Sequence, residues 1–262
     1  MRGQLRRLGR AVRGLLGHVG NLSRLELALA RRVLAPVGYS VRLTSKLTLT
    51  QARFSGLHAA PLLAVLGAMI GAVGILQFVS LLAGLADDLM GKLLVTIIVR
   101  EMGPLIAAVL LIGRSGTAMA TELGTMRLGG ELEALAAYRI DPVAFVLLPR
   151  VAGMVFAMFA SIVLFDVTGL LGGSVIAVLV KDLSFTLLRG RVAAALTPAD
   201  FGMTVLKALV FGQTIALFSC YFGLRVKRSP TELPQAVTRA VVASLAGVFA
   251  ADAVLAAAYY FA

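Results

Sequence analysis

The chain has 262 residues, of which 59% are hydrophobic and 15% are charged, and its mean hydropathy is +0.93. This composition excludes an ordinary soluble domain and predicts an all-α, polytopic helical membrane protein. The formal net charge of +12 does not indicate nucleic-acid binding, because eleven of the 25 Lys and Arg residues lie before residue 54, among leucines rather than stacking aromatics. Basic residues beside apolar segments are more simply explained as topology determinants and contacts to anionic lipid.

The N-terminal residues 1–60 are predicted to form a basic interfacial region. Within residues 1–20, leucines and valines recur at helical spacing with arginines mainly between them, which predicts an amphipathic helix in the headgroup layer. A solvated helix packed on a partner protein is the alternative. The first long apolar run begins near Pro61, too late for a cleavable signal, so we expect the mature chain to start near Met1.

Residues 61–262 are predicted to form one transmembrane domain with about five spans, each close to the roughly 20 residues that a bilayer core requires. The predicted spans cover residues 61–83, 92–113, 150–180, 203–224 and 239–261. The third is overlong, and its Gly169, Gly172 and Gly173 permit a bend or a close helix contact. The single cysteine, Cys220, excludes an internal disulfide and is expected to be a small buried packing residue.

The distribution of Lys and Arg predicts the orientation. With the N-terminus inside, nineteen of these residues fall in the cytoplasmic segments and four in the segments on the other side. The positive-inside rule therefore places the N-terminus in the cytoplasm and the C-terminus outside.

A polar segment of about residues 114–149 interrupts the hydropathy and is expected to lie in the cytoplasm. Within it, Glu131–Ala137 combines good helix formers with acidic residues in the first turn, which predicts a short helix. Asp141-Pro142 is a helix stop. A short cytoplasmic helix between two spans is a surface that an ATPase subunit could bind and move.

The chain shows no sequence for catalysis of its own. It has no G-x-x-x-x-G-K-S/T phosphate loop, and His18 and His58 stand without ligand partners at metal spacing. Any transport work therefore requires energy from a partner.

Five ionisable residues fall inside predicted spans, where each is costly unless it is paired or hydrated. They are Arg100, Glu101, Asp166, Lys207 and Asp252. For Arg100, Glu101 and Lys207 two accounts remain open: they pair between helices, or they line a cavity that receives a polar headgroup. For Asp166 and Asp252 pairing between helices is favoured.

The segment GPLIAAVLLIGRSGTAMATELGTMR, followed by ELEAL, IDP and LPR, resembles the signature region of the MlaE/YrbE-type permeases. KALVFGQTIALFSCYFG and TRAVVASLAGVFAADAVL are also similar to that family. The resemblance covers about residues 61–262 and is most specific over 100–150.

The resemblance implies the membrane subunit of an ABC transporter. It implies a homodimer that exchanges lipid with a periplasmic MCE-domain protein, driven by cytoplasmic ATPase subunits that carry the ATP and Mg, with no cofactor in this chain. In Gram-negative bacteria such a complex resides in the inner membrane, moves phospholipid and supports outer-membrane lipid asymmetry.

The resemblance also implies roles for particular residues. Arg100, Glu101 and Lys207 would lie near the lipid cavity. The residues that would couple the permease to the ATPase are Glu122, Gly124, Met126, Arg127, Glu131, Leu132, Glu133, Ala134 and Leu135.

The chain departs from the family pattern at two places. Gly129-Gly130-Glu131 replaces a common Thr-Glu-Gln, which removes a helix cap and loosens the start of the helix. Residues 227–234 replace a stretch that is usually glycine-rich.

Two other classes of protein remain as alternatives. An ion-coupled secondary transporter would use the intramembrane charges, but we find no inverted repeat and no pair of broken helices. A purely structural membrane scaffold would tolerate neutral replacements of those charges.

Overall fold

A computed structural model describes Leu27 and residues 41–81, 95–181, 190, 192–227 and 229–261. Throughout these described residues the regular structure is helical, which confirms the all-α prediction. The predicted helix over residues 1–20 lies outside the described residues, as do residues 84–92 between the first two predicted spans. The described part of the interfacial region forms α2 (Val41–Leu57).

Four described helical stretches are long and apolar enough to cross a membrane: Val95–Leu128, Val143–Ile176, Pro198–Gly223 and Pro230–Tyr259. A fifth is possible if α2 and α3 (Ala60–Leu81) are counted as one span bent by 43°. The prediction of a polytopic helical membrane protein with about five spans is thereby confirmed.

The first of the four stretches is longer than predicted. It is built from η1 (Val95–Met102), which is π-helical, α5 (Gly103–Leu111), a second π-helical turn, η2 (Ile112–Gly116), and α6 (Thr117–Leu128). The span was expected to end at residue 113, but the helix continues for another fifteen residues to Leu128. The start of the polar segment is therefore an extension of a spanning helix.

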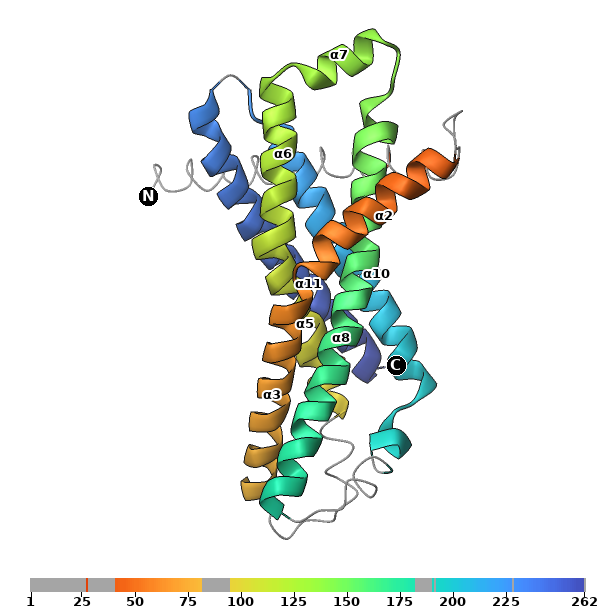
Figure 1. Ribbon diagram of the computed structural model, residues 1–262, viewed down its shortest axis with the longest axis vertical. Coiled ribbons are helices and arrows are strands. Elements are labelled where there is room, and N and C mark those ends of the chain that lie inside the picture. Colours follow the sequence, from red (N-terminus) through yellow and green to blue (C-terminus); the bar gives the residue numbers. More distant parts are fainter. Residues whose placement is uncertain are drawn as a thin grey trace, which may run out of the picture.

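The remaining elements connect the spans in order. The short helix α7 (Glu131–Ala137) leads through η3 (Val143–Leu147) into α8 (Leu148–Lys181). After residues 182–189 the chain forms α10 (Pro198–Gly223), a 3-10 turn, η4 (Pro230–Glu232), and α11 (Leu233–Phe261). In Figure 1, α7 lies across one end of the molecule, and α3 and α8 run side by side toward the other.

Helices α3 and α8 pack closely because small residues face each other. A Cβ added to Gly71 would lie 1.8 Å from the Gly169 carbonyl oxygen, and one added to Gly172 would lie 2.4 Å from the Ala68 carbonyl oxygen. Side chains at these positions would force the helices apart. The expected close helix contact at Gly169 and Gly172 is confirmed.

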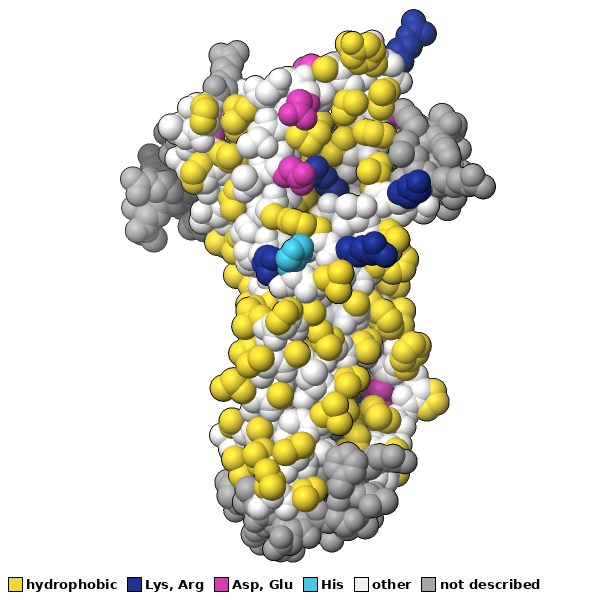
Figure 2. Space-filling view, in the orientation of Figure 1, with side chains coloured by type: hydrophobic (Ala, Val, Ile, Leu, Met, Phe, Trp, Pro, Cys, Tyr) yellow, Lys and Arg dark blue, Asp and Glu magenta, His cyan; other side chains and the backbone are white. Residues whose placement is uncertain are grey.

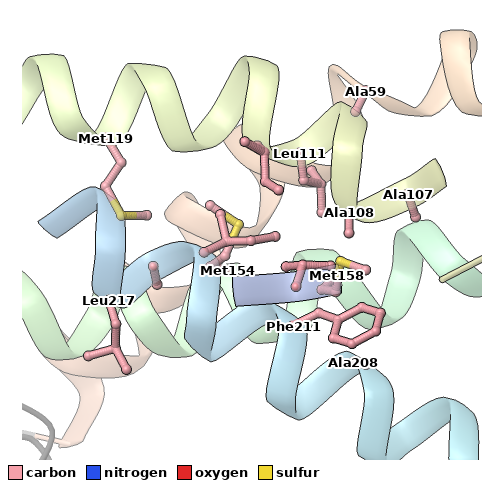
Figure 3. Close-up of a cluster of buried hydrophobic side chains, with 14 of the residues drawn as sticks. Ala59, Ala107, Ala108, Leu111, Met119, Met154, Met158, Ala208, Phe211 and Leu217 are labelled. Atoms are coloured by element: carbon pink, nitrogen blue, oxygen red, sulfur yellow. The ribbon is translucent and has the colours of Figure 1, made fainter. Parts of the chain in front are cut away.

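The core lies where α5, α6, α8 and α10 meet. Figure 3 shows Leu111, Met119, Met154, Met158 and Phe211 gathered between these helices. All five side chains are buried.

The outer surface carries an apolar band. On α3 the exposed large hydrophobic residues recur every three or four positions, which marks a lipid-facing stripe; they are Leu62, Val65, Met69, Val73 and Leu76. On the face drawn in Figure 2, charged side chains gather at the end with α2, α6 and α7, whereas the surface over α3 is mainly apolar. This division is typical of a span with a polar extension outside the bilayer.

Candidate functional site

The buried amine of Lys207 is the centre of a charged cluster that joins η1, α10 and α11. Lys207 is only 1% exposed, and its Nζ lies 2.7 Å from Asp252 Oδ1 and 3.3 Å from Glu101 Oε2. It also donates a hydrogen bond of 2.6 Å to the carbonyl oxygen of Arg100. The ammonium thus donates hydrogen bonds to Arg100 and Glu101 and forms an ion pair with Asp252, and such pairing is the condition for burying a charge.

Pro104 explains why the Arg100 carbonyl can accept this bond. In a regular α-helix that carbonyl would accept a bond from the N–H of the residue four positions later, and proline has no N–H. The local helix is π-helical just before the Gly103-Pro104 step. The sequence of η1 and α5 thus presents a backbone acceptor to a lysine 107 positions later.

Arg100 forms the second half of the cluster. Its Nε lies 2.6 Å from Asp200 Oδ1, and its guanidinium lies 5.2 Å from the centre of the Tyr259 ring. Asp200 also accepts bonds from the backbone N–H (2.8 Å) and hydroxyl (2.9 Å) of Thr197, forming a capping box at the start of α10. The cap therefore fixes the carboxylate that faces Arg100.

The cluster has a sealed side and an accessible side. The side chains of Lys207 and Asp200 are 1% and 2% exposed, whereas those of Arg100 and Glu101 are 20% and 31% exposed. The cluster holds two cations and three carboxylates. A polar ligand that approached the cluster would contact Arg100 and Glu101 of η1 first. Lys207 lies on the buried side of these two residues and hydrogen-bonds to both.

The structure brings Arg100, Glu101 and Lys207 together, as the sequence reasoning grouped them. The expectation that Asp252 pairs between helices is confirmed by its contact with Lys207. Asp200 and Tyr259 were missed. The Thr-Pro-Ala-Asp pattern at 197–200 is a capping-box signal that could have indicated Asp200, but no local pattern points to Tyr259.

Asp166 approaches the same region from α8. A Cβ on Gly103 would lie 2.0 Å from Asp166 Oδ1, so the carboxyl group packs directly against this glycine and would have to move if a side chain were added. Asp166 is buried, and within the described residues its Oδ1 has no hydrogen-bond partner. The pairing expected for Asp166 is therefore not seen for that atom, and the contact with Gly103 is one of close packing.

The predicted short helix is confirmed as α7, Glu131–Ala137. Gly130, directly before it, has φ of 71°, a left-handed conformation that favours glycine. The two glycines were expected to loosen the start of this helix. Gly130 instead forms a left-handed turn that a residue with a side chain would adopt only with strain.

The predicted coupling residues divide between an exposed face and internal packing. Glu122, Arg127, Glu131 and Glu133 are exposed; Arg127 pairs with Glu133, and Glu122 lies 3.2 Å from Arg150. Leu132 is buried in the core cluster.

Three further coupling residues face inward, and the last lies on the exposed side. A Cβ on Gly124 would lie 2.3 Å from Leu233 Cδ1, so Gly124 packs α6 against the start of α11. Met126 accepts a weak bond from Arg150, and Leu135 packs against the core. Ala134 is exposed on α7.

Comparison with known proteins identifies the family. The family model for Permease MlaE matches residues 48–258. A probable ABC transporter permease protein of Rickettsia felis is 30% identical over 227 residues, which cover 86% of each chain.

Two relatives have names that mention lipids. The intermembrane phospholipid transport system permease protein MlaE of Haemophilus influenzae is 27% identical over 216 residues, covering 80% of this chain and 82% of the relative. The chloroplastic protein TRIGALACTOSYLDIACYLGLYCEROL 1 of Arabidopsis thaliana is 32% identical over 162 residues, covering 62% and 46%. Together the family match and the relatives support an ABC transporter permease. Since the family match over residues 48–258 covers most of the chain, including the five charged residues of the cluster and α7, the chain belongs to the MlaE permease family.

Proposed function

We propose that this chain is the membrane permease subunit of an ABC transporter that moves phospholipid or a related lipid between the inner membrane and a periplasmic MCE-domain protein. In a Gram-negative cell this transport would contribute to outer-membrane lipid asymmetry. The observation that carries the proposal is the accessible edge of the charged cluster, since Arg100 and Glu101 are partly exposed within a helix that is long and apolar enough to span a membrane. The name of the Haemophilus influenzae relative supports phospholipid as the cargo.

In this proposal Arg100 and Glu101 contact the lipid headgroup, and Lys207 holds them in place. An arginine can bind a phosphate with two parallel hydrogen bonds, and a carboxylate can accept bonds from an amine or hydroxyl headgroup. The apolar surfaces around the cluster would accommodate the acyl chains. A second copy of the chain would complete the cavity as a homodimer.

The proposed site of ATPase contact is α7 with the adjacent face of α6. Its exposed side presents Arg127, Glu131 and Glu133, and Tyr138 beyond it is 80% exposed. An exposed helix between two spans can transmit movement from a partner into the membrane domain. ATP and Mg would bind to that partner, and this chain would catalyse no reaction.

The proposed orientation places α7 and the N-terminus in the cytoplasm and the C-terminus in the periplasm. The nineteen-to-four distribution of Lys and Arg supports this. The polar end seen in Figure 2 is the end that carries α7, which agrees with a cytoplasmic extension.

Transfer of a fluorescent phospholipid tests the proposal. The chain is reconstituted in liposomes with its ATPase and MCE partners, and movement of lipid to the MCE protein is followed with and without ATP. Arg100→Gln is expected to reduce ATP-dependent transfer strongly, whereas Arg53→Gln, at an exposed site on α2, is expected to leave it unchanged. Equal transfer by both variants would contradict a headgroup role for Arg100.

A second comparison tests coupling. Replacing Glu131 and Glu133 with lysine is expected to prevent copurification of the ATPase, and unchanged copurification would refute the contact site. Transport that persists under an ion gradient without any ATPase would instead favour a secondary transporter, which the buried Lys207–Asp252 pair could serve. Full transfer after neutralisation of Arg100, Glu101 and Lys207 would favour a structural scaffold.

A further inference from the structure

A groove at the α7 end of the molecule is separate from the charged cluster. It has a volume of about 860 Å³ and lies between the end of α10 and the first half of α11. Lys227 and Glu232, which line it, belong to the segment that departs from the family pattern. Lys207 and Asp252 lie farther along the same two helices, away from this end.

The groove changes from polar to apolar along α11. Gln235, Arg239, Val242 and Ala246 line it at spacings of four, three and four residues, so they share one helix face. Arg239 and Ala246 are separated by seven residues, or about 10 Å along the helix axis. A ligand in the groove would therefore meet charge at one end and an apolar wall at the other.

The polar end has an excess of positive charge. Arg225, Lys227 and Arg239 line it together with one carboxylate, Glu232, which accepts a bond of 3.0 Å from the backbone N–H of Lys227. Arg225 donates a 2.8 Å hydrogen bond to the hydroxyl oxygen of Tyr221, and its guanidinium lies 5.1 Å from the centre of that ring. These contacts hold one arginine at the rim of the groove in a defined position.

Arg239 is available for a ligand. It is exposed, and within the described residues it forms no ion pair. A guanidinium on a helix that lines the same groove as a second guanidinium and an apolar wall fits the phosphate of an amphiphile. A free anion would not require the apolar part of the groove.

We infer that this groove binds one anionic phospholipid from the surrounding leaflet, with its phosphate on Arg225 and Arg239 and an acyl chain along Val242 and Ala246. The bound lipid is a resident of the permease and need not be its cargo. The inference therefore does not depend on the proposed transport function. Charge complementarity and the polarity gradient along α11 favour a lipid over a protein segment as the occupant.

Lipid retention by the full chain tests the inference. The chain is placed in bilayers of phosphatidylcholine with a minor fraction of phosphatidylglycerol, extracted in mild detergent, and analysed for retained lipid by mass spectrometry. We expect phosphatidylglycerol to be enriched over its bulk fraction. Arg239→Gln should lower that enrichment by about fivefold, the effect of one basic residue at a lipid surface, and Arg53→Gln on α2 should not change it.

Ala246→Phe tests the apolar end without a change of charge. The ring would fill the wall on which the acyl chain lies, so enrichment should fall although all three cations remain. This variant also tests the inference if Arg239→Gln fails to fold.

Three outcomes would overturn the inference. Equal loss of enrichment with Arg53→Gln would show non-specific attraction to the basic surface. Unchanged enrichment in both groove variants would show that lipid does not occupy the groove. A change from dimer to monomer with lipid retention intact would show that the groove is a protein interface. A loss of lipid transport with unchanged lipid retention would contradict the proposed function but not this lipid site, because retention is measured without ATP or partners.

Discussion

Lys207→Met removes the central cation of the charged cluster and leaves its partner Asp252 buried without a countercharge. Asp252 would lose a contact of 2.7 Å, and the Arg100 carbonyl would lose the donor that replaces the missing proline N–H. Asp252 is buried, so its charge would be poorly hydrated. Removing one partner of a buried ion pair costs about 3–5 kcal/mol.

This loss should appear as a large drop in thermal stability. For chains of this size about 2–4 °C corresponds to 1 kcal/mol, so we expect the unfolding midpoint to fall by roughly 10 °C. The single cysteine, Cys220, is fully buried and can report unfolding through a thiol-reactive dye in detergent.

The double variant Lys207→Met with Asp252→Asn separates two costs: the loss of the ion pair and the burial of an unpaired Asp252 carboxylate. Neutralising Asp252 removes the uncompensated charge, so we expect the double variant to recover at least half of the lost stability. A single variant that unfolds at the wild-type temperature would refute the energetic role of the cluster. A double variant no more stable than the single one would show that the cost comes from lost packing.

Three further substitutions follow from local geometry. Gly71→Ala places a methyl group against the α8 backbone and should cost about 1–3 kcal/mol, whereas Gly74→Ala meets open space and should be neutral; equal dye midpoints would contradict the close contact. Gly130→Ala should strain the turn before α7 by about 1 kcal/mol and weaken ATPase copurification, with Gly129→Ala, which has a negative φ, as its control. Thr197→Ala removes the capping box and should lower the dye midpoint by a few degrees, at a cost of about 1 kcal/mol, and an unchanged midpoint would show that the cap is dispensable.

The short helix α7 could be predicted because its signals are local. Good helix formers, acidic residues in the first turn and a following Asp-Pro step all lie within twelve residues. Asp141 lies between α7 and η3, and its side chain accepts a hydrogen bond of 2.9 Å from the Val143 N–H at the start of η3. The role of Gly130 could not be predicted in the same way, since its left-handed φ depends on the angle at which α6 must turn into α7.

The end of the second predicted span was wrong because hydropathy measures apolar length and not helix continuity. Arg114 interrupts the apolar run, but its Nη1 donates a hydrogen bond of 2.6 Å to the His58 carbonyl oxygen at the bend between α2 and α3. The following threonines bond back to helix carbonyls three or four residues earlier. Neither kind of polar residue therefore breaks the helix, and it continues to Leu128.

The charged cluster shows which part of a site depends on topology. The sequence indicates that charges within spans need partners, but not that Lys207 pairs with a residue 45 positions later on α11 and also with η1. Choosing among the carboxylates requires the order in which the helices pack. Asp252 and Glu101 meet one amine only because α11 and η1 both pack against α10, which carries Lys207.

Pro104 links the local and the long-range parts of that cluster. The proline removes one backbone donor, and the vacated Arg100 carbonyl is the acceptor that Lys207 uses. Arg100 therefore contacts α10 twice: its carbonyl oxygen binds Lys207, and its guanidinium pairs with Asp200. A shift of α10 would therefore act on Arg100 through both its carbonyl and its guanidinium. The partly exposed edge of the cluster is thus mechanically tied to the packing of the spans, which is the arrangement that a ligand site driven by helix movement requires.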